Sequence, residues 1–170
     1  MILVDKEDKA LGTIDKLQAH IEGRLHRAFS ICIFREVNSE SELLLQQRHQ
    51  DKYHSGGLWS NTCCSHPRSG ETVIDAASRR LQEEMGFTNQ LSAIGSLCYR
   101  AELENGLIEH EYDHILVGKY SGQPIRINPM EVLAYKWISV QEALDCLQED
   151  TTTFTPWFSL VLQHIIDKKT

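Results

Sequence analysis

The chain of 170 residues contains 41% hydrophobic and 24% charged residues, proportions that fit a globular protein and exclude a disordered or collagen-like chain. Its 17 Lys and Arg residues against 24 Asp and Glu give a net charge of −7, which argues against nonspecific binding to nucleic acid. Apolar runs are far shorter than the ~20 residues of a membrane span, and residues 1–4 are followed at once by four charged residues, unlike the apolar region of a signal peptide. We therefore expect one domain over residues 1–170 in the cytoplasm, with five reduced cysteines, no nucleic-acid or membrane partner and no obligate protein partner.

The first half of the chain alternates apolar runs with turn signals. Residues 28–35 form a strongly apolar run of strand length, and the turn signal Asn38-Ser39 precedes a second predicted strand that begins at residue 43. Residues 50–71 contain glycines and two adjacent cysteines, so we expect a long structured loop there, of the kind that usually carries function. Residues 72–85 predict a helix that Gly86 ends.

The second half continues this mixture. Further strands are predicted at residues 96–103, 109–120 and 132–138, with a turn at Asn105-Gly106 between the first two. Ser139 and Glu142 have the spacing of a capping box that opens a helix to about residue 148. Thr155-Pro156 predicts the start of a last helix, with proline at the first helical position. Strands interleaved with helices predict an α/β (α+β) fold whose core spans about residues 28–148.

The helix predicted at residues 72–85 carries a carboxylate toward its apolar face. At about 100° per residue, that face contains Val73, Ala77, Leu81 and Met85, with Ile74 beside them. Glu84 falls in the same arc, and a buried isolated charge is so costly that it must be paired or bind a cation. Arg80, four residues earlier, offers an ion pair, whereas Glu71 and Glu83 nearby favour a metal.

The strand predicted at residues 109–120 carries three carboxylates on one face. Alternate residues of a strand share a face at a spacing of about 6.6 Å, so Glu109, Glu111 and Asp113 lie together. The same face continues into Ile115 and Val117, which favour burial. Because three neighbouring carboxylates repel one another, this strand predicts either a cation site or a solvated strand end.

Histidines and cysteines supply further candidate ligands. His20 and His26 precede the first core strand, and His66 follows Cys64 in the loop. Together with the spaced glutamates they would form a nitrogen and oxygen site, which suits Zn²⁺ or Mn²⁺, whereas Mg²⁺ prefers oxygen alone. Cys64 lies in a polar loop beside His66 and is a candidate reactive thiol. We expect the cysteines in strand or helix patterns to be small buried hydrophobic residues, namely Cys32, Cys98 and Cys146.

Residues 65–87 resemble the Nudix box, a loop–helix–loop that holds Mg²⁺ against a diphosphate and has the pattern G-x₅-E-x₇-R-E-U-x-E-E-x-G-U, with U apolar. The matching residues are Glu71, Arg79, Leu81, Glu83, Glu84, Gly86 and Phe87. Ser65 stands at the first glycine, and Arg80 stands at a glutamate that Nudix hydrolases use in the metal cluster that activates water. The resemblance implies a single Nudix-type domain with mixed β-sheets between helices, while Arg80 argues against hydrolysis of the diphosphate.

Five segments, in chain order, are similar to motifs of the type 1 isopentenyl-diphosphate isomerase family. They are residues 24–30 (RLHRAFS), 58–67 (LWSNTCCSHP), 99–101 (YRA), 109–111 (EHE) and 155–157 (TPW). The match runs from about residue 3 to the last helix. It implies an isomerase that interconverts isopentenyl diphosphate and dimethylallyl diphosphate in isoprenoid biosynthesis.

The resemblance also implies roles for the matched residues. Cys64 and Glu111 would be the acid–base pair on opposite faces of this small-molecule substrate, with Tyr99 assisting. One Zn²⁺ or Mn²⁺ would be held by His20, His26, His66, Glu109 and Glu111. Glu84 would help to bind a Mg²⁺ that bridges the diphosphate. The phosphate oxygens would be bound by Lys16, Arg48, Lys52 and Arg80, and Trp157 would lie over the isoprenyl carbons.

Two other functions stay open at the level of the sequence. A Nudix hydrolase acting on a nucleotide or another diphosphate is suggested by Glu71, Glu83 and Glu84. A non-enzymatic module that binds a metal or a partner is suggested by the content of His, Cys and Glu.

Overall fold

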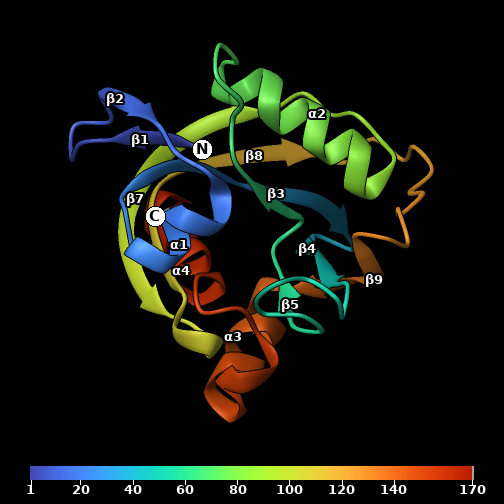
Figure 1. Cartoon of the computed structure of the whole chain (residues 1–170). Helices are drawn as coiled ribbons and strands as arrows, with labels where there is room; N and C mark the ends of the chain where they lie inside the picture. The colour runs from blue at the N-terminus through green and yellow to red at the C-terminus, as the bar shows by residue number, and fades with distance from the viewer. Residues whose placement is uncertain (170) are drawn as a thin grey trace.

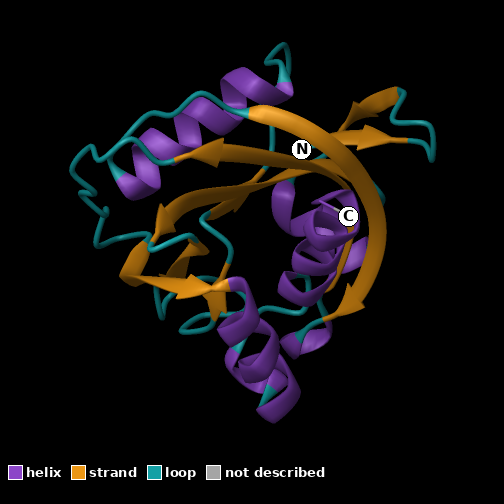
Figure 2. Cartoon of the chain, turned by 180° about the vertical axis from the view of Figure 1, so that it is seen from behind, coloured by secondary structure: helices purple, strands orange, loops and turns teal. Residues whose placement is uncertain are grey.

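The computed structural model of the chain describes residues 1–169, in which nine strands belong to one sheet (Figures 1 and 2). The strands are β1 (Ile2–Val4), β2 (Ala10–Thr13), β3 (His26–Val37), β4 (Glu40–Arg48), β5 (Trp59–Ser60), β6 (Cys63–Ser65), β7 (Ser92–Glu102), β8 (Ile108–Lys119) and β9 (Val132–Ser139). The helices are α1 (Lys16–Glu22), α2 (Val73–Met85), α3 (Val140–Glu149) and α4 (Phe158–Lys169), with 3₁₀ turns η1 (Glu104–Gly106) and η2 (Thr151–Thr153). This order confirms the predicted α+β class.

Strand β3 is the centre of the sheet. It pairs parallel to β8 and antiparallel to β4 and β6, and it also contacts β1. The sheet continues from β8 to β7 and from β4 to β5 and β9. Parallel neighbours need a long crossover connection, and here the chain between β3 and β8 includes helix α2. The sheet is therefore mixed, as the Nudix resemblance implies.

Two apolar cores lie on the two faces of the sheet. Ile31 and Ile33 of β3 pack with Leu81 of α2 in one core, whereas Cys32 and Phe34 belong to the other core, which includes residues of α3 and α4. This split follows from the strand period of two, because successive side chains point to opposite faces. Figure 1 shows α2 on one side of β3 and β8, and α4 inside the curve of β7 on the other.

Short-range signals place both ends of α2 and the start of α3 correctly. The Thr72 side chain accepts a hydrogen bond from the Asp75 N–H at the start of α2, and that of Ser139 accepts one from the Glu142 N–H at the start of α3. Helix α2 ends at Gly86, which has a φ of 73° and lies so close to the Arg126 carbonyl that a Cβ would be 2.2 Å from its oxygen. Glycine is therefore required there for two reasons, conformation and space.

The structure corrects several local predictions. The last helix begins at Phe158 and not at Pro156, because a separate turn precedes it in which the Phe158 N–H donates to the Thr155 carbonyl. The segment 50–71 is not only a loop, since it includes β5 and β6. The hairpin β1–β2 was not predicted, because its strands have three and four residues and no readable pattern. None of the described helices is long and apolar enough to cross a bilayer.

Two predictions of side-chain burial are wrong. Cys98 is exposed, since it lies on the face of β7 opposite to the buried Tyr99. Ile74 is 39% exposed in the first turn of α2, outside the face that packs on the sheet. Cys32 is buried and Cys146 half-buried, close to expectation.

Replacing Leu81 by alanine should lower the free energy of unfolding by about 2–5 kcal/mol, the usual range for deleting a fully buried leucine side chain. Leu81 is 0% exposed in the α2 core. Urea denaturation followed by tryptophan fluorescence measures the change. The control Ile74→Ala, on the same helix but outside the core, should cost less than about 1 kcal/mol. Equal losses in the two variants would contradict this packing.

Candidate active site

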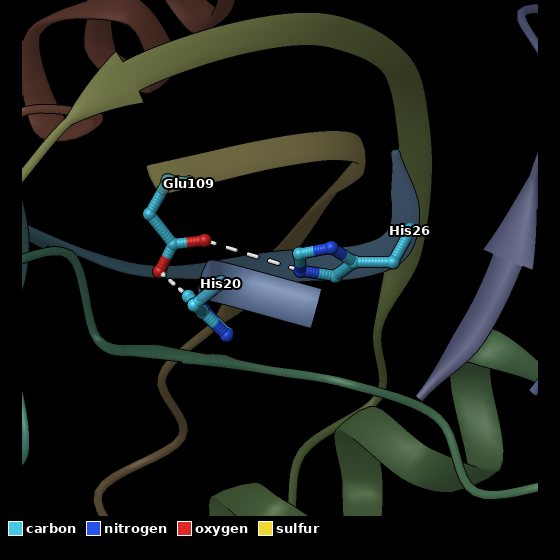
Figure 3. A group of neighbouring side chains, drawn as sticks. All are labelled: His20, His26 and Glu109. Carbon is cyan, nitrogen blue, oxygen red and sulfur yellow. Dashed lines mark ion pairs between the residues drawn. The ribbon is translucent and has the colours of Figure 1, made fainter. Parts of the chain in front are cut away.

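The pairing of β3 with β8 brings predicted metal ligands together. His26 lies directly beside Glu111 in the parallel register, and Glu109 lies on the same face of β8. His20, near the end of α1, has its Nε2 3.3 Å from Oε1 of Glu109. Figure 3 shows the carboxylate of Glu109 facing both histidines, with Nε2 of His26 3.9 Å from its Oε2. The two histidines are 0% exposed and Glu109 is 3% exposed, so this candidate ligand group is buried.

A second candidate group shares His26. Nε2 of His66 lies 2.8 Å from Oε1 of Glu111, and Nε2 of His26 lies 3.6 Å from the same oxygen. In each group, the candidate ligand atoms lie within 4.8 Å of one another. The structure thus brings together all five predicted ligands of the first metal, His20, His26, His66, Glu109 and Glu111.

His54 belongs to this cluster and was missed from the sequence. Its Nε2 lies 3.1 Å from Oε1 of Glu109, and the residue is 4% exposed. It lies in the irregular chain between β4 and β5, where no periodicity indicates which way a side chain points. A tyrosine before it and a serine and two glycines after it were the available signal, and such a run is also typical of an ordinary turn.

The cluster has the properties of a cation site. Nε2 of His26 and Oε2 of Glu109 are buried without a hydrogen-bond partner, a costly state that a ligand would relieve. Burial lowers the pKa of His66 to about 4 and also lowers that of His54, so both rings are neutral, as metal ligation requires. Burial acts to lower the pKa of His26 too, but its contact with Glu111 outweighs this and raises it. Positive charge is thus favoured at this point, and the nitrogen and oxygen donors fit a divalent cation.

Cys64 lies in a polar niche built from three parts of the chain. It is paired with Ser30 in the β3–β6 ladder, its Sγ–H donates to Oδ1 of Asn61 at 3.0 Å, and the indole N–H of Trp157 donates to Sγ at 3.1 Å. Burial raises the pKa of Cys64 to about 12. The thiol is therefore protonated at neutral pH and can donate a proton.

Glu111 joins the histidine cluster to Tyr99. The two residues are opposite each other in the β7–β8 register, and the Tyr99 hydroxyl donates to Oε2 of Glu111 at 2.7 Å. Burial and the charge of Glu109 act to raise the pKa of Glu111, but contacts with His26 and His66 outweigh them and lower it. Burial raises the pKa of Tyr99 well above its ordinary value, so its O–H is retained as a donor. Glu111 is a carboxylate with one oxygen toward the histidines and the other on the tyrosine.

The three carboxylates of β8 are buried, which excludes the solvated strand end that the sequence left open. Glu109 is 3%, Glu111 7% and Asp113 0% exposed. Asp113 contacts the neighbouring strand β3 and not the histidines, since its Oδ2 accepts a hydrogen bond from Ser30 at 2.8 Å. Burial and the charge of Glu111 raise the pKa of Asp113 well above its usual range, and the neutral acid relieves the repulsion.

The basic side chains that the resemblance assigns to phosphate binding lie together beside the cluster. The cavity lining includes Lys16, Arg48, Lys52 and Arg80. Arg48 donates to two backbone carbonyls, and its guanidinium carbon lies 5.3 Å from the centre of the Trp157 ring. Burial lowers the pKa of Lys16, and the charges of Lys52 and Arg48 lower it further. This crowding of positive charge favours a ligand with several negative charges.

The glutamates of helix α2 and of the loop before it differ in whether they line the cavity. Glu84 is 3% exposed, lines the cavity and forms the predicted ion pair with Arg80. Glu71 instead accepts hydrogen bonds of 2.8 Å from Arg79, and Glu83 pairs with Arg79 and Arg80. The sequence suggested a metal from Glu71 and Glu83 together, but in the structure arginines neutralise both of them.

A small cavity of about 80 Å³ unites these groups. Its lining contains every predicted site residue except the fully buried His20 and His26. It adjoins a wider basic pocket of about 600 Å³, with which it shares Lys16, Lys52 and Arg80. The Cys64 thiol, the Glu111 carboxylate, the Trp157 indole and several cations therefore surround one small cavity. We call the adjoining wider pocket the basic mouth.

The sequence model of the NUDIX domain matches residues 24–158 of this chain. A protein of Photobacterium profundum named isopentenyl-diphosphate Delta-isomerase is 49% identical over 170 residues, which cover 99% of this chain and 94% of the relative. Another of that name, from Burkholderia multivorans, is 50% identical over 164 residues, which cover 96% of this chain and 91% of the relative. The chain belongs to the isopentenyl-diphosphate Delta-isomerases of the Nudix family.

Solved structures confirm the Nudix fold of this isomerase family member. A Deinococcus radiodurans protein, DR0079, has a TM-score of 0.76 at 17% identity and covers 96% of this chain and 97% of its own. The NUDIX domain of Shewanella oneidensis NrtR, complexed with ADP ribose, has a TM-score of 0.67 at 14% identity, with 86% and 89% covered. At such low identity these likenesses concern the fold alone. Membership among the isomerases shows that the chain is an enzyme, so the interpretation as a non-enzymatic binding module is wrong.

Proposed function

We propose that this chain catalyses the reaction for which its relatives are named, the interconversion of isopentenyl diphosphate and dimethylallyl diphosphate. The observation that carries the proposal is the presence of a protonated thiol, Cys64, and a carboxylate, Glu111, in the wall of one small cavity. Moving a double bond by proton transfer needs one group that donates a proton and another that accepts one.

Cys64 and Glu111 act on opposite faces of the substrate. When the thiol donates a proton to the alkene carbon, Glu111 accepts one from the carbon on the far side of the cationic centre, and the roles reverse in the other direction. The Tyr99 hydroxyl, 2.7 Å from Oε2 of Glu111, stabilises the charged form of this carboxylate. One proton is added and one removed, so the substrate keeps its composition.

Trp157 stabilises the tertiary carbocation formed between the two proton transfers. It is 3% exposed, and its N–H is held by Ser60 Oγ at 3.0 Å and by the sulfur of Cys64. An aromatic face attracts a cation through its quadrupole. The enclosed position of the ring also excludes water, which would otherwise trap the cation as an alcohol.

The diphosphate serves as a handle. A cavity of about 80 Å³ is far smaller than the ~300–1,000 Å³ of typical ligand pockets, and it suits a short aliphatic chain. The diphosphate then lies toward the basic mouth, where charge-assisted hydrogen bonds hold it. The donors are Lys16, Arg48, Lys52 and Arg80.

Metal ions complete the proposed site. One Zn²⁺ or Mn²⁺ would be held by His20, His26, His66, Glu109 and Glu111, with His54 against Glu109. Such a cation would fix the position and the proton affinity of Glu111. Glu84 would help to hold a Mg²⁺, which typically takes one or two carboxylates together with phosphate oxygens and water.

The alternative, hydrolysis of a nucleotide or another diphosphate, lacks support from the contacts. Arg80 occupies the position of a hydrolase glutamate, and Glu71 and Glu83 are bound by arginines. A positive charge there stabilises the diphosphate and supplies no ligand for a metal that would activate water.

Incubation of the metal-loaded enzyme with isopentenyl diphosphate in D₂O tests the proposal. We expect NMR to show dimethylallyl diphosphate with deuterium at both carbons that exchange protons, and no release of phosphate. Phosphate release without exchange would favour the hydrolase, and the absence of both would contradict the proposed activity.

We also propose a cytoplasmic location and action without an obligate protein or nucleic-acid partner. A catalytic Cys64 needs a reduced thiol, which a reducing compartment maintains. The acid, the carboxylate and the cations of the cavity all come from this one chain.

A further inference from the structure

A carboxylate faces the cations of the basic mouth. The wider pocket is lined by Lys16, Lys52, Arg68, Arg79 and Arg80, and among the described residues of this lining Glu131 is the single carboxylate. Glu131 binds Nζ of Lys52 and lies 3.5 Å from Nη2 of Arg80. Glu131 therefore pairs with Lys52 and Arg80, two of the cations that the proposed function assigns to the diphosphate.

Glu131 is held there by its backbone and is only 27% exposed at its side chain. Its N–H donates to the Asn128 carbonyl at 2.9 Å, and its carbonyl accepts from the His49 N–H at 2.9 Å. The Asn128 N–H in turn donates to the carbonyl of Glu84 at 2.8 Å, which joins this turn to the end of α2. Because the turn is anchored at both ends, the carboxylate stays near the mouth whether or not a ligand is present.

Arg80 does not need Glu131 to balance its charge. Arg80 already has two carboxylate partners on its own helix, Glu83 and Glu84. Lys16, by contrast, is crowded by neighbouring cations. The mouth therefore keeps a positive charge that attracts a diphosphate, while Glu131 opposes its tightest engagement with Lys52 and Arg80.

We infer that Glu131 is a counter-ion that the diphosphate displaces from Lys52 and Arg80, and that it weakens diphosphate binding so that product can leave. This inference rests on the proposed function. It makes Glu131 a residue that sets the affinity for the diphosphate group and not one that takes part in proton transfer.

Titration calorimetry with inorganic diphosphate as its magnesium complex tests the inference on the metal-loaded enzyme. Glu131→Gln keeps the size of the side chain and removes its charge. We expect about tenfold tighter binding, because the ligand no longer has to displace a carboxylate that attracts Lys52 and Arg80 at a partly buried site. The KM for isopentenyl diphosphate should fall in parallel.

The control is Glu42→Gln, which removes the partner of Arg35 outside the pocket and should leave diphosphate binding unchanged. A second variant, Glu131→Ser, should change affinity in the same direction as Glu131→Gln, and thermal denaturation verifies that both are folded. Unchanged or weaker binding in folded Glu131 variants would overturn the inference, because a carboxylate that merely positions Lys52 has that effect.

The two proposals fail in different ways. If wild-type enzyme binds diphosphate and isomerises its substrate but the Glu131 variants bind no tighter, only the counter-ion role is wrong. If wild-type enzyme binds diphosphate without isomerising, the proposed function fails while the affinity comparison still decides the role of Glu131. Wild-type enzyme that binds no diphosphate would overturn both.

Discussion

Replacing Cys64 by alanine should lower kcat for isomerisation by about 10²–10⁴-fold, the usual contribution of a positioned acid or base. The thiol is half-buried, protonated and held by Asn61 and Trp157 in the wall of the cavity. Alanine leaves space but no proton at that point. NMR of substrate conversion measures the loss, and KM should change little because Cys64 does not contact the basic mouth.

The matched control is Cys98→Ala, because Cys98 is an exposed cysteine on β7. This variant should retain wild-type turnover. Near-UV circular dichroism should show native packing in both variants, which separates loss of chemistry from loss of fold. Near-normal turnover in folded Cys64→Ala enzyme would rule out Cys64 as the acid–base group.

Removal of the metal should abolish isomerisation and lower the melting temperature by about 10 °C, as expected for loss of a ligand bound at about 1,000 times its Kd in a chain of this size. Without a cation, the negative charges of the buried Glu109 and Glu111 repel each other, and Nε2 of His26, which lies 3.6 Å from Oε1 of Glu111, has no hydrogen-bond partner. Differential scanning fluorimetry before and after chelation measures stability. Adding back Zn²⁺, Mn²⁺ or Mg²⁺ singly then shows which ion restores it.

Two histidine variants test whether the metal binds at the candidate ligand groups. His26→Ala should remove the response of the melting temperature to chelation and to added metal, because His26 belongs to both candidate ligand groups. His164→Gln, on α4 outside both groups, should keep the full response. If the wild-type melting temperature were the same with and without chelator, the cluster would not be a metal site.

The spacing of apolar and charged residues within single helices and strands predicted on which face many side chains lie. The strand period predicted that Glu109, Glu111 and Asp113 share one face with Ile115, and the structure decides that this face is buried and not a solvated strand end. The helical period predicted that Glu84 points toward the core, and of the two partners that the sequence offered, Arg80 and a metal, the structure contains the ion pair with Arg80. These predictions succeed because the strand and helix periods determine the side on which each residue lies, and that needs no knowledge of distant parts.

This spacing gave no prediction where the chain has neither a helix period nor a strand period long enough to recognise. His54 and Glu131 lie in irregular turns, and the strands of the hairpin β1–β2 are too short to read. Asp113 was grouped with the other carboxylates, yet it binds Ser30, because its partner is set by the strand beside it.

The sequence by itself determined the α+β class, the ends of α2, the face of β8 that carries the acids, and the motif residues Cys64 and Glu111. Only the tertiary structure decided that His26 lies beside Glu111, that His20 and His54 reach Glu109, and that Glu131 meets Lys52. The reason is physical. The helix and strand periods determine on which face of its own element a side chain lies, whereas the choice and register of distant strand partners depend on burying both faces of the sheet at once.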